Sequence, residues 1–419
     1  MLNFKIKKQI FLNCLSAVQG ASEKKGSMPI ISNLLIESVE NNFIKVSATD
    51  LEISIVTYCN AEIISEGKTT INSKKIYNII KEFPEGKEKK DEDEDLFIKF
   101  IENEAGVVTI SYKKTVFKLT TVPASDYPTI IDFESEDNFN IELKTFKTLI
   151  SKVILSTAAS EDTKRNLTGV YFVLEEELDG KDYLRLVATD GHRLSLAQSE
   201  INYNGGKNGG IYDLLKTGVI IPRKILTEVL KLDKEGFIKI LINSNNVIFE
   251  FEKQSDNLNK NTKLISRLIE GKFPDYNTVL PKDGYKTSII NTKNFYNSIK
   301  MVSLLAEEKS HSIELSFSEN NLLIKTVNTN IGEGSDELEI NYKGEPISIK
   351  LNSRYIMDFI SNITENNLSV RFNTIYTPFV IEPYIISEHA SDGNDNTGKT
   401  NNNAVKPMQV IGIFMPMRY

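Results

Sequence analysis

The stretch Leu186-Val187-Ala188-Thr189-Asp190-Gly191 matches an earlier stretch, Val46-Ser47-Ala48-Thr49-Asp50-Leu51, which lies about 140 residues before it. Each runs from an alternating apolar segment into a turn that contains Asp. Lys325-Thr326-Val327-Asn328-Thr329-Asn330 takes the corresponding place in the last third, where the pattern is degenerate. A period of this length is too long for a solenoid repeat and suits a whole domain. The sequence therefore predicts three copies of one domain.

Each third also carries two helix candidates and a set of alternating strands. Apolar residues recur at helical spacing over residues 8–21, 144–159 and 293–306. A short basic helix is then predicted after a polar or proline cap, at Asn72-Ser73-Lys74-Lys75, Ile221-Pro222-Arg223-Lys224 and Asn352-Ser353-Arg354-Tyr355. Alternation typical of strands is clear in the first third over residues 33–38, 43–47, 52–57, 107–111 and 117–120.

The balance of these elements predicts the fold class. About six to eight strands and two helices in each third, with few long crossovers, favour antiparallel sheets with helices on one face, the α+β class. Similar Pro-aromatic segments at residues 122–128 and 271–276 mark the domain ends. We therefore expect domains at residues 1–135, 136–286 and 287–419, the last with a polar insertion at about 387–406.

The composition is that of an ordinary soluble protein. Hydrophobic residues make up 40% of the 419 residues and charged residues 26%. No apolar run is long enough to cross a bilayer, and residues 1–5 alternate like a strand, so we expect a cytoplasmic protein without membrane contacts. Cys14 and Cys59 lie far apart in the sequence and form no cluster with histidine, which predicts two core thiols and neither a disulfide nor a zinc site. No cofactor motif is present.

The net charge of −7 argues at first against a nucleic-acid partner. The acidic residues, however, gather in apparent loops such as 85–95 and 175–179, whereas lysine and arginine recur on the helix candidates. Solvated helix faces would explain any one of these helices. Recurrence in three domains also fits a basic surface that contacts phosphates without reading sequence. The candidates are Lys74, Lys81, Lys164, Arg165, Arg223 and Lys224.

One cluster could be catalytic, because Asp190 and His192 are two residues apart and could form an acid–base pair. The alternative is structural: Asp-Gly after an apolar strand is a turn signal, and the equivalent Thr49-Asp50-Leu51-Glu52 has no histidine. Gly332-Glu333-Gly334 is only a fragment of a dinucleotide motif, in a segment expected to be a polar loop. The sequence therefore favours a protein without catalytic activity.

Several motifs together resemble the β subunits of bacterial DNA polymerase III, the sliding clamps. They are Pro29-Ile30-Ile31-Ser32-Asn33-Leu34-Leu35, Thr189-Asp190-Gly191-His192-Arg193-Leu194, Gly271-Lys272-Phe273-Pro274-Asp275-Tyr276 and the terminal Met415-Pro416-Met417-Arg418-Tyr419. The resemblance spans nearly the whole chain in order. It implies three similar domains, a head-to-tail dimeric ring with helices lining a central hole, and no catalytic activity. Such a ring would encircle duplex DNA, slide along it and tether the replicative polymerase.

The resemblance also implies roles for particular residues. Lys25 takes the place of a DNA-contacting basic residue, and Lys164, Arg165 and Asn166 lie on a segment that touches DNA. A cleft between the second and third domains would bind short Leu/Phe-bearing peptides of the polymerase α subunit, the clamp-loader δ subunit, other polymerases and repair proteins. Its residues would be Leu167, Thr189, Gly191, His192, Arg193, Leu194, Pro274, Thr278, Val279, Pro378, Ile413, Phe414, Met415, Pro416, Met417 and Arg418.

The chain also departs from the family pattern. Residues 387–406 look like an insertion where the family has a short turn, Tyr419 stands where an aliphatic residue is common, and Thr278 stands where some members carry a basic residue. Taken alone, residues 411–415 are a final strand, with Met415 and Met417 as core filler. A DNA-binding or scaffold protein that uses the same fold without encircling DNA is the alternative from another class.

Overall fold

The structure, a computed structural model, describes residues 1–22, 28–40, 42–84, 97–135, 137–159, 164–176, 180–201, 210–232, 235–251, 262–281, 284–385 and 408–418. The expectations for Lys25, the acidic stretch at 85–95, the insertion at 387–406 and Tyr419 concern positions outside these residues.

The chain forms two compact units, and the middle third of the sequence contributes strands to both. Unit 1 comprises Met1–Lys144, Asn204–Leu214 and Lys224–Leu268, and unit 2 comprises Thr145–Tyr203, Leu215–Arg223 and Ile269–Tyr419. Each unit contains one large and one small antiparallel sheet among its described residues. Antiparallel pairing with short connections is what the alternating segments of the sequence predicted.

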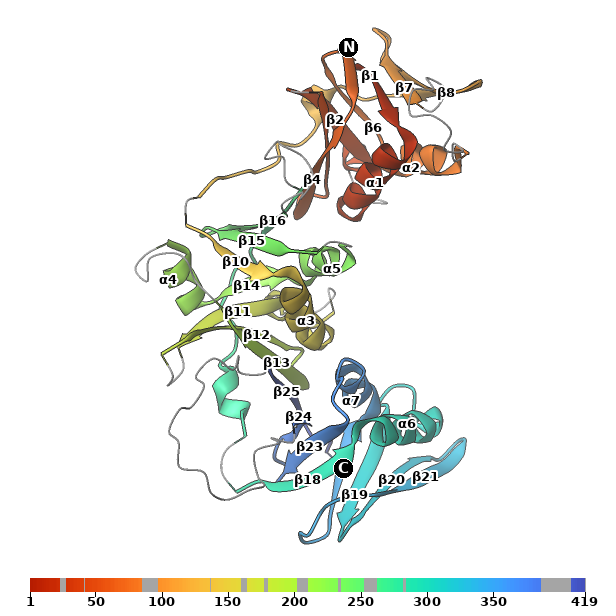
Figure 1. Ribbon diagram of the computed structural model, residues 1–419. Helices are drawn as coiled ribbons and strands as arrows, with labels where there is room; N and C mark the ends of the chain where they lie inside the picture. The colour runs from red at the N-terminus through yellow and green to blue at the C-terminus, as the bar shows by residue number, and fades with distance from the viewer. Residues whose placement is uncertain are drawn as a thin grey trace, which may run out of the picture. The chain divides into compact units, whose positions relative to one another are not determined.

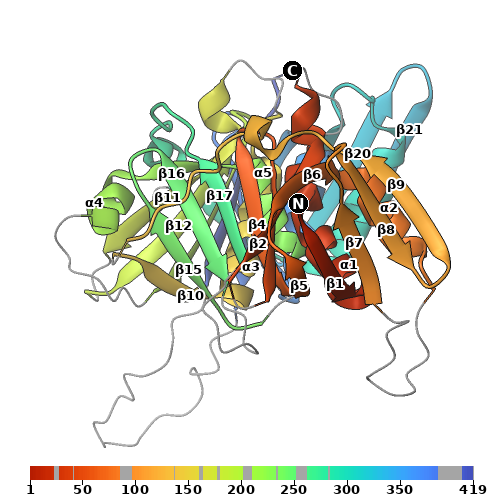
Figure 2. The same cartoon turned by 90° about the horizontal axis from the view of Figure 1, so that it is seen from above.

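Unit 1 joins strands of the first and middle thirds into one sheet of eight strands. In order these are β10 (Phe139–Glu142), β15 (Phe237–Ile242), β16 (Asn246–Phe251), β17 (Thr262–Arg267), β4 (Ile53–Asn60), β3 (Phe43–Thr49), β2 (Asn33–Val39) and β6 (Lys68–Asn72). The pairing of β4 with β17, which lie side by side in Figure 2, is called the first joint. The small sheet has the order β5 (Glu62–Ser65), β1 (Asn3–Lys7), β7 (Phe97–Glu102), β8 (Val107–Tyr112) and β9 (Thr115–Thr120).

Unit 2 repeats this plan with strands of the middle and last thirds. Its large sheet has the order β14 (Val219–Pro222), β11 (Gly169–Glu176), β12 (Asp182–Thr189), β13 (Arg193–Glu200), β25 (Gln409–Phe414), β24 (Phe379–Tyr384), β23 (Asn367–Phe372) and β18 (Lys286–Asn291). The pairing of β13 with β25 is the second joint (Figure 1). The small sheet has the order β21 (Gly332–Glu339), β20 (Asn321–Asn328), β19 (Ser312–Ser318) and β22 (Ile347–Asn352).

The helices lie where the apolar periodicity predicts them. The long ones are α1 (Lys8–Val18), α3 (Leu143–Val153) and α6 (Thr292–Val302), each extended by a 3-10 turn of three residues. The short ones are α2 (Ser73–Glu82), α5 (Arg223–Lys231) and α7 (Ser353–Ile360). Side-chain oxygens of Asn72 and Asn352 accept backbone N–H bonds at the starts of α2 and α7, as the polar caps predict. α1 buries Phe11, Cys14, Leu15 and Val18 and packs against β3 and β4.

The repeated turn has the same hydrogen bonds in both copies. Asp50 Oδ1 accepts the backbone N–H groups of Glu52 and Ile53 at 3.0 and 2.8 Å, and Asp190 Oδ1 accepts those of His192 and Arg193 at 2.9 and 3.0 Å. The third turn position has positive φ in both, 76° at Leu51 and 91° at Gly191. The sequence similarity thus reflects one turn geometry, with Asp as its organising residue.

Three details differ from the sequence expectations. The first third contains nine strands among its described residues, one more than expected, because β5 is a short edge strand on β1. Gly332-Glu333-Gly334 begins strand β21 and is not a loop, because backbone pairing with β20 overrides the low strand propensity of glycine. The helix α4 (Gly210–Thr217) was not predicted, because its eight residues adjoin an Asn/Gly-rich stretch.

Candidate functional site

Three segments of the predicted cleft meet at one end of the second joint. β13 begins at Arg193, which is paired with Phe414 at the end of β25, and Phe414 is paired in turn with Phe379 at the start of β24. The backbone N–H of Met415 donates a hydrogen bond to the carbonyl of His192 at 2.9 Å. The turn at residues 190–192, the chain after Phe414 and the loop before Phe379 therefore lie together.

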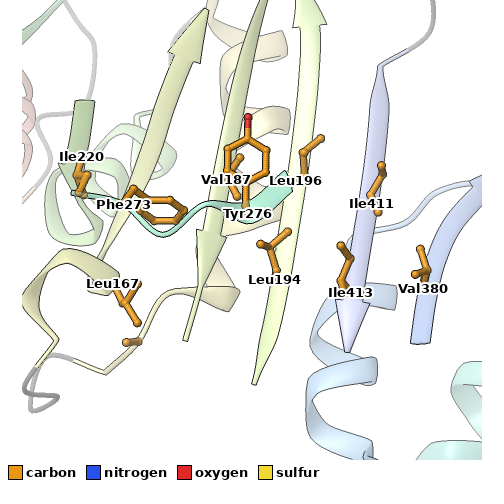
Figure 3. Packing of buried hydrophobic residues seen from close by; sticks show 11 residues of the cluster. Leu167, Val187, Leu194, Leu196, Ile220, Phe273, Tyr276, Val380, Ile411 and Ile413 are labelled. Carbon is orange, nitrogen blue, oxygen red and sulfur yellow. The ribbon is translucent and has the colours of Figure 1, made fainter. Parts of the chain in front are cut away.

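An apolar cluster covers the sheet face opposite the helices, which we call the outer face of the second joint. It contains four residues of the predicted cleft: Leu167, Leu194 and Ile413 are buried (Figure 3), and Val279 packs against the cluster. Strand alternation explains the division, because Leu194 and Leu196 point to this face while Ser195 bonds Ser156 Oγ on the helix side at 2.7 Å. These four residues of the predicted cleft therefore belong to a single connected apolar cluster.

A strap formed by residues 271–281 holds the edge of this cluster. The ring of Phe273 stacks on Tyr171 with centroids 4.8 Å apart. The hydroxyl of Tyr276 accepts a bond from Arg185 at 3.2 Å and donates to Glu175 at 3.2 Å, and burial raises the pKa of this phenol. These anchors leave Pro274 and Thr278 exposed and Val279 half-buried against the cluster.

Arg193 points away from the outer face, toward the helices. Its Nε bonds Asp190 Oδ2 at 3.1 Å, its Nη1 bonds Asp358 Oδ2 at 2.8 Å, and its Nη2 bonds the carbonyl of Leu155. The guanidinium also lies over the ring of Tyr355, 4.3 Å from the centroid. Of the predicted cleft residues, Arg193 therefore acts on the helix side by fixing the turn against α7, while Gly191 and His192 beside it are exposed.

Ile413 is the last residue of the C-terminal segment in the cluster. The N–H of Met417 donates to the carbonyl of Lys350 in β22 at 2.8 Å. Met417 and Arg418 then line a separate cavity of about 470 Å³, with Glu314 and Lys325 among its other residues. The segment therefore has two parts: Met415 and Pro416 are half-buried, with Met415 bonded to the turn at His192, whereas Met417 and Arg418 lie beside the small sheet.

Two tyrosines near this site were missed by the sequence reasoning. Tyr376 is 80% exposed in the loop before β24, two residues from the predicted Pro378. The loop is held by Thr377, whose Oγ1 accepts the N–H of Thr374 at 2.8 Å. Tyr355, under Arg193, is the second. An exposed aromatic residue inside a polar turn was a usable sequence signal for Tyr376, whereas the place of Tyr355 depends on the tertiary packing of α7.

The predicted DNA-contacting residues lie on helices and at one turn. Lys74 and Lys81 on α2, Lys164 and Arg165 before β11, and Arg223 and Lys224 on α5 are all exposed. Several candidates make internal bonds: Lys224 pairs with Asp50 Oδ2, Asn166 Nδ2 donates to the carbonyl of Lys272 at 2.8 Å, and Arg223 Nη1 donates to Thr157 Oγ1 at 3.3 Å. These side chains are therefore partly committed to the fold.

The possible acid–base pair has a structural role in the turn. Both carboxylate oxygens of Asp190 are bound, Oδ1 by two backbone N–H groups and Oδ2 by Arg193. Asp50, which has no histidine beside it, makes the same backbone bonds. Among the described residues no three His, Cys, Asp or Glu side chains could hold a metal ion, and both cysteines are buried free thiols. No helix in the described stretches of the chain is long and apolar enough to cross a membrane.

The repeated antiparallel domains with two principal helices each, joined through shared sheets, define the class of DNA sliding clamps. The family models for the N-terminal, central and C-terminal domains of the DNA polymerase III beta subunit match residues 2–131, 140–275 and 277–389. The chain belongs to the DNA polymerase III beta subunit family, the non-catalytic processivity clamps of bacterial replication.

Individual relatives support this assignment over nearly the full length. The beta sliding clamp of Caulobacter vibrioides is 29% identical over 381 residues, which cover 90% of this chain and 95% of the relative. That of Escherichia coli K12 is 28% identical over 387 residues, 91% of this chain and 96% of the relative. Crystal structures of clamps from Caulobacter crescentus, with PEG bound, and Bartonella birtlesii, bound to griselimycin, both align with a TM-score of 0.83. Their identities are 26% and 25%, and each alignment covers 100% of both chains.

Proposed function

We propose that two copies of this chain close into a ring around duplex DNA and tether DNA polymerase III to it. The supporting observation is a regularity of strand pairing. The strand after each repeated turn pairs with the last strand of the following domain, β4 with β17 and β13 with β25. β21 follows the third turn and β9 ends the first domain, yet each is an edge strand among the described strands of one chain. In a dimer, β21 of each subunit would pair with β9 of the other, which continues the same pattern.

The two edges are complementary in charge. The end of the small sheet at β9 exposes Lys113, Lys114 and Lys118, whereas β21 carries Glu333, Asp336, Glu337 and Glu339. Both also expose apolar side chains: Val116 is 55% and Phe117 38% exposed on β9, and Val327 is 60% and Ile331 67% exposed beside β21. Opposite charges around apolar contacts fit a specific interface. A head-to-tail contact of this kind forms a closed ring when its rotation closes, here with three domains from each subunit.

We place the domains at residues 1–135, 136–286 and 287–419, close to the three ranges matched by the family models. Within each domain the short basic helices supply exposed lysine and arginine side chains. Lys25, Lys74, Lys81, Lys164, Arg165, Asn166, Arg223 and Lys224 are the candidates for phosphate contact. A ring holds DNA by topology, so weak phosphate contacts suffice. Nonspecific dissociation constants on the order of 10⁻⁴ to 10⁻⁶ M would permit sliding.

We assign partner peptides to the outer face of the second joint. The occupants are short Leu/Phe-bearing segments of the polymerase α subunit, the clamp-loader δ subunit, other polymerases and repair proteins, acting in the cytoplasm. Burial of two such side chains contributes roughly 3 to 6 kcal/mol before ordering costs, so micromolar affinity is expected. Methionine at position 415 makes the surface adaptable to several partners.

The first joint explains why one cleft per subunit is expected. There the N–H of Arg267 bonds the carbonyl of Glu52 at 3.2 Å, as Met415 bonds His192 at the second joint. Ile53 and Arg193 correspond, because the backbone N–H of each bonds the Asp of its turn. Ser54, the next residue, therefore corresponds to Leu194. At this position the first joint therefore has serine where the second has leucine, beside a smaller buried cluster of Val56, Leu241, Ile248 and Ile265, and we expect an apolar peptide to gain less there.

Retention on circular DNA tests the encircling function. The loaded protein should remain on closed circular DNA and leave when the circle is cut once, because topology alone holds it. A protein that dissociates equally fast from circular and linear DNA would instead be a non-encircling binder. Native mass measurement at micromolar concentration should show a dimer, and a persistent monomer would contradict the proposed ring.

A further inference from the structure

A second cavity lies on the helix side of the first joint, at the opposite end of α5 from Arg223 and Lys224. Its volume is about 610 Å³, within the range of small-molecule sites. Its walls come from α1, the last turn of α5, β4 and β17. Apolar side chains form much of the lining, among them Ile10, Ala17, Ile55 and Leu264, and the carboxylate of Glu228 lies at its wall.

The second joint shows how the same place is filled elsewhere in this chain. Lys152, near the end of α3, reaches the carbonyl of Asn362 after α7. Arg193 bonds both Asp358 on α7 and the carbonyl of Leu155. Two cationic side chains, one with a long hydrocarbon stem, thus connect α3, α7 and the strand between them.

Corresponding positions follow from the matched elements. Ala17 is the next-to-last residue of α1, as Lys152 is of α3, and each helix continues into a 3-10 turn. The backbone N–H of Ile53 donates to Asp50 Oδ1, as that of Arg193 donates to Asp190 Oδ1. With Arg223 aligned to Arg354, as the caps of the two helices are, Glu228 lies one residue beyond the counterpart of Asp358. The first joint therefore has a carboxylate on the matching helix, one position further along, and has Ala17 and Ile53 in place of the two cations.

The remaining carboxylate is held in place by the chain around it. The side chain of Glu228 is 11% exposed and forms an ion pair with Lys231 on its own helix, whose side chain is 62% exposed. A Cβ atom at Gly20 would lie 1.9 Å from Glu228 Oε2, so the carboxylate fits against the end of α1 because residue 20 is glycine. Lys231, which also lines the cavity, meets Glu228 at Oε1, and a cation inside the cavity would give this mostly buried carboxylate a second partner.

We propose that this cavity binds a short aliphatic amine. Its ammonium group pairs with Glu228, and its methylene chain contacts Ile10, Ala17 and Leu264. The ligand supplies at the first joint the charge and hydrocarbon that Lys152 and Arg193 supply at the second. Bound there, it contacts both α1 and α5 and links elements of the first and middle thirds of the sequence.

Calorimetric titration of the full-length protein with 1,4-diaminobutane tests this site. Wild-type protein should bind it saturably, and Glu228→Gln should weaken binding at least tenfold. Ala17→Lys should weaken binding equally by placing an internal amine in the cavity. Ala17→Met, which copies Met301 at the matching position of α6, should do so by filling space without charge. Glu104→Gln, at an exposed carboxylate elsewhere, should bind like wild type.

Several results would overturn the proposal. They are the absence of saturable binding to wild type, unchanged affinity in Glu228→Gln or in both Ala17 variants, or equal binding of the neutral 1-butanol. Magnesium ion that binds the cavity as tightly as diaminobutane would also count against the proposal, because a hydrated ion gains nothing from contact with the apolar wall. Thermal unfolding of each variant without ligand separates lost binding from lost folding.

Discussion

Asp50 shows how one side chain can organise a joint between repeated domains. Its side chain is 4% exposed, caps two backbone N–H groups with one oxygen and pairs with Lys224 through the other. The partner lies on α5, which comes from the middle third of the sequence. The same residue therefore shapes a local turn and fixes a distant helix beside it.

We expect Asp50→Ala to destabilise unit 1 by about 2 to 4 kcal/mol, because the buried N–H of Ile53 and the partly buried N–H of Glu52 lose a charged acceptor. Asp50→Asn retains an oxygen acceptor and should cost less. Urea unfolding measures both changes. Asp126→Ala, at an exposed carboxylate, serves as the control, and equal effects of Asp50→Ala and Asp126→Ala would contradict this role.

Tyr376 gives a second prediction at the scale of one residue. It is 80% exposed at the loop that adjoins the end of the second joint. If partner peptides bind there, Tyr376→Ala should weaken binding of a fluorescent Leu/Phe-bearing peptide by about 1 kcal/mol through lost aromatic contact. Tyr384, 40% exposed at the other end of β24, provides the matched control, and Tyr384→Ala should leave affinity unchanged. Equal losses in both variants would argue against a local contact.

Among the elements, the C-terminal segment has two different environments. β25 is an internal strand of its sheet, paired with β13 and β24, so its removal would disrupt the second joint. The residues after Phe414 lie beyond that pairing and contact the fold through the Met415 and Met417 N–H bonds. Sequence position alone does not reveal this boundary between fold and surface.

Deletion of Met415 to Tyr419 should therefore abolish peptide binding while the dimer still forms, because β25 remains whole. Fluorescence anisotropy measures the peptide and native mass the assembly. A subtler change, Met415→Ala, should weaken binding by roughly 1 to 3 kcal/mol. Full peptide affinity in the folded truncation would remove the second joint as the partner site.

For the whole molecule, the proposed ring closes through edges that the single chain leaves unpaired among its described strands. Lys113, Lys114 and Lys118 changed together to Glu should raise the dimer dissociation constant at least a hundredfold, since both partner edges would then be acidic. Changing Asp336, Glu337 and Glu339 to Lys should do the same. Sedimentation or native mass gives the assembly state, and circular dichroism confirms folding.

Mixing the two charge-reversed proteins is the decisive control. One interface of the mixed dimer would join the acidic form of β9 to the basic form of β21, so the two proteins should associate although neither dimerises alone. Failure of the mixture to associate would mean that β9 and β21 are not the contact.

DNA contact is also a property of the assembled molecule. Replacing Lys25, Lys164 and Arg165 together with Ala should reduce the salt dependence of DNA association, by a slope of about 2 to 3 if each meets one phosphate, and leave the dimer intact. Lys343→Ala, at an exposed lysine outside this set, should leave the slope unchanged. An unchanged slope in the triple variant would reject these residues as DNA contacts.

The sequence by itself determined the local structure and the family. Helical periodicity located α1, α3 and α6, the polar caps located α2 and α7, and the Asp turn recurred with the same hydrogen bonds. These features depend on neighbours within a few residues, which a sequence displays directly. The same holds for the clamp family, because its motifs are short and ordered along the chain.

Only the tertiary structure decided which distant groups meet. Leu167, Leu194, Val279 and Ile413 were expected in one cleft and share one cluster, whereas Arg193 turned to the helix side, where Asp358 and the Leu155 carbonyl bind it. Strand pairing across the joints brings these segments together, and a period of two fixes the face on which each side chain lies. Local sequence predicts neither the register of β13 on β25 nor the cavity between α1 and α5, because both result from packing between segments far apart in the chain.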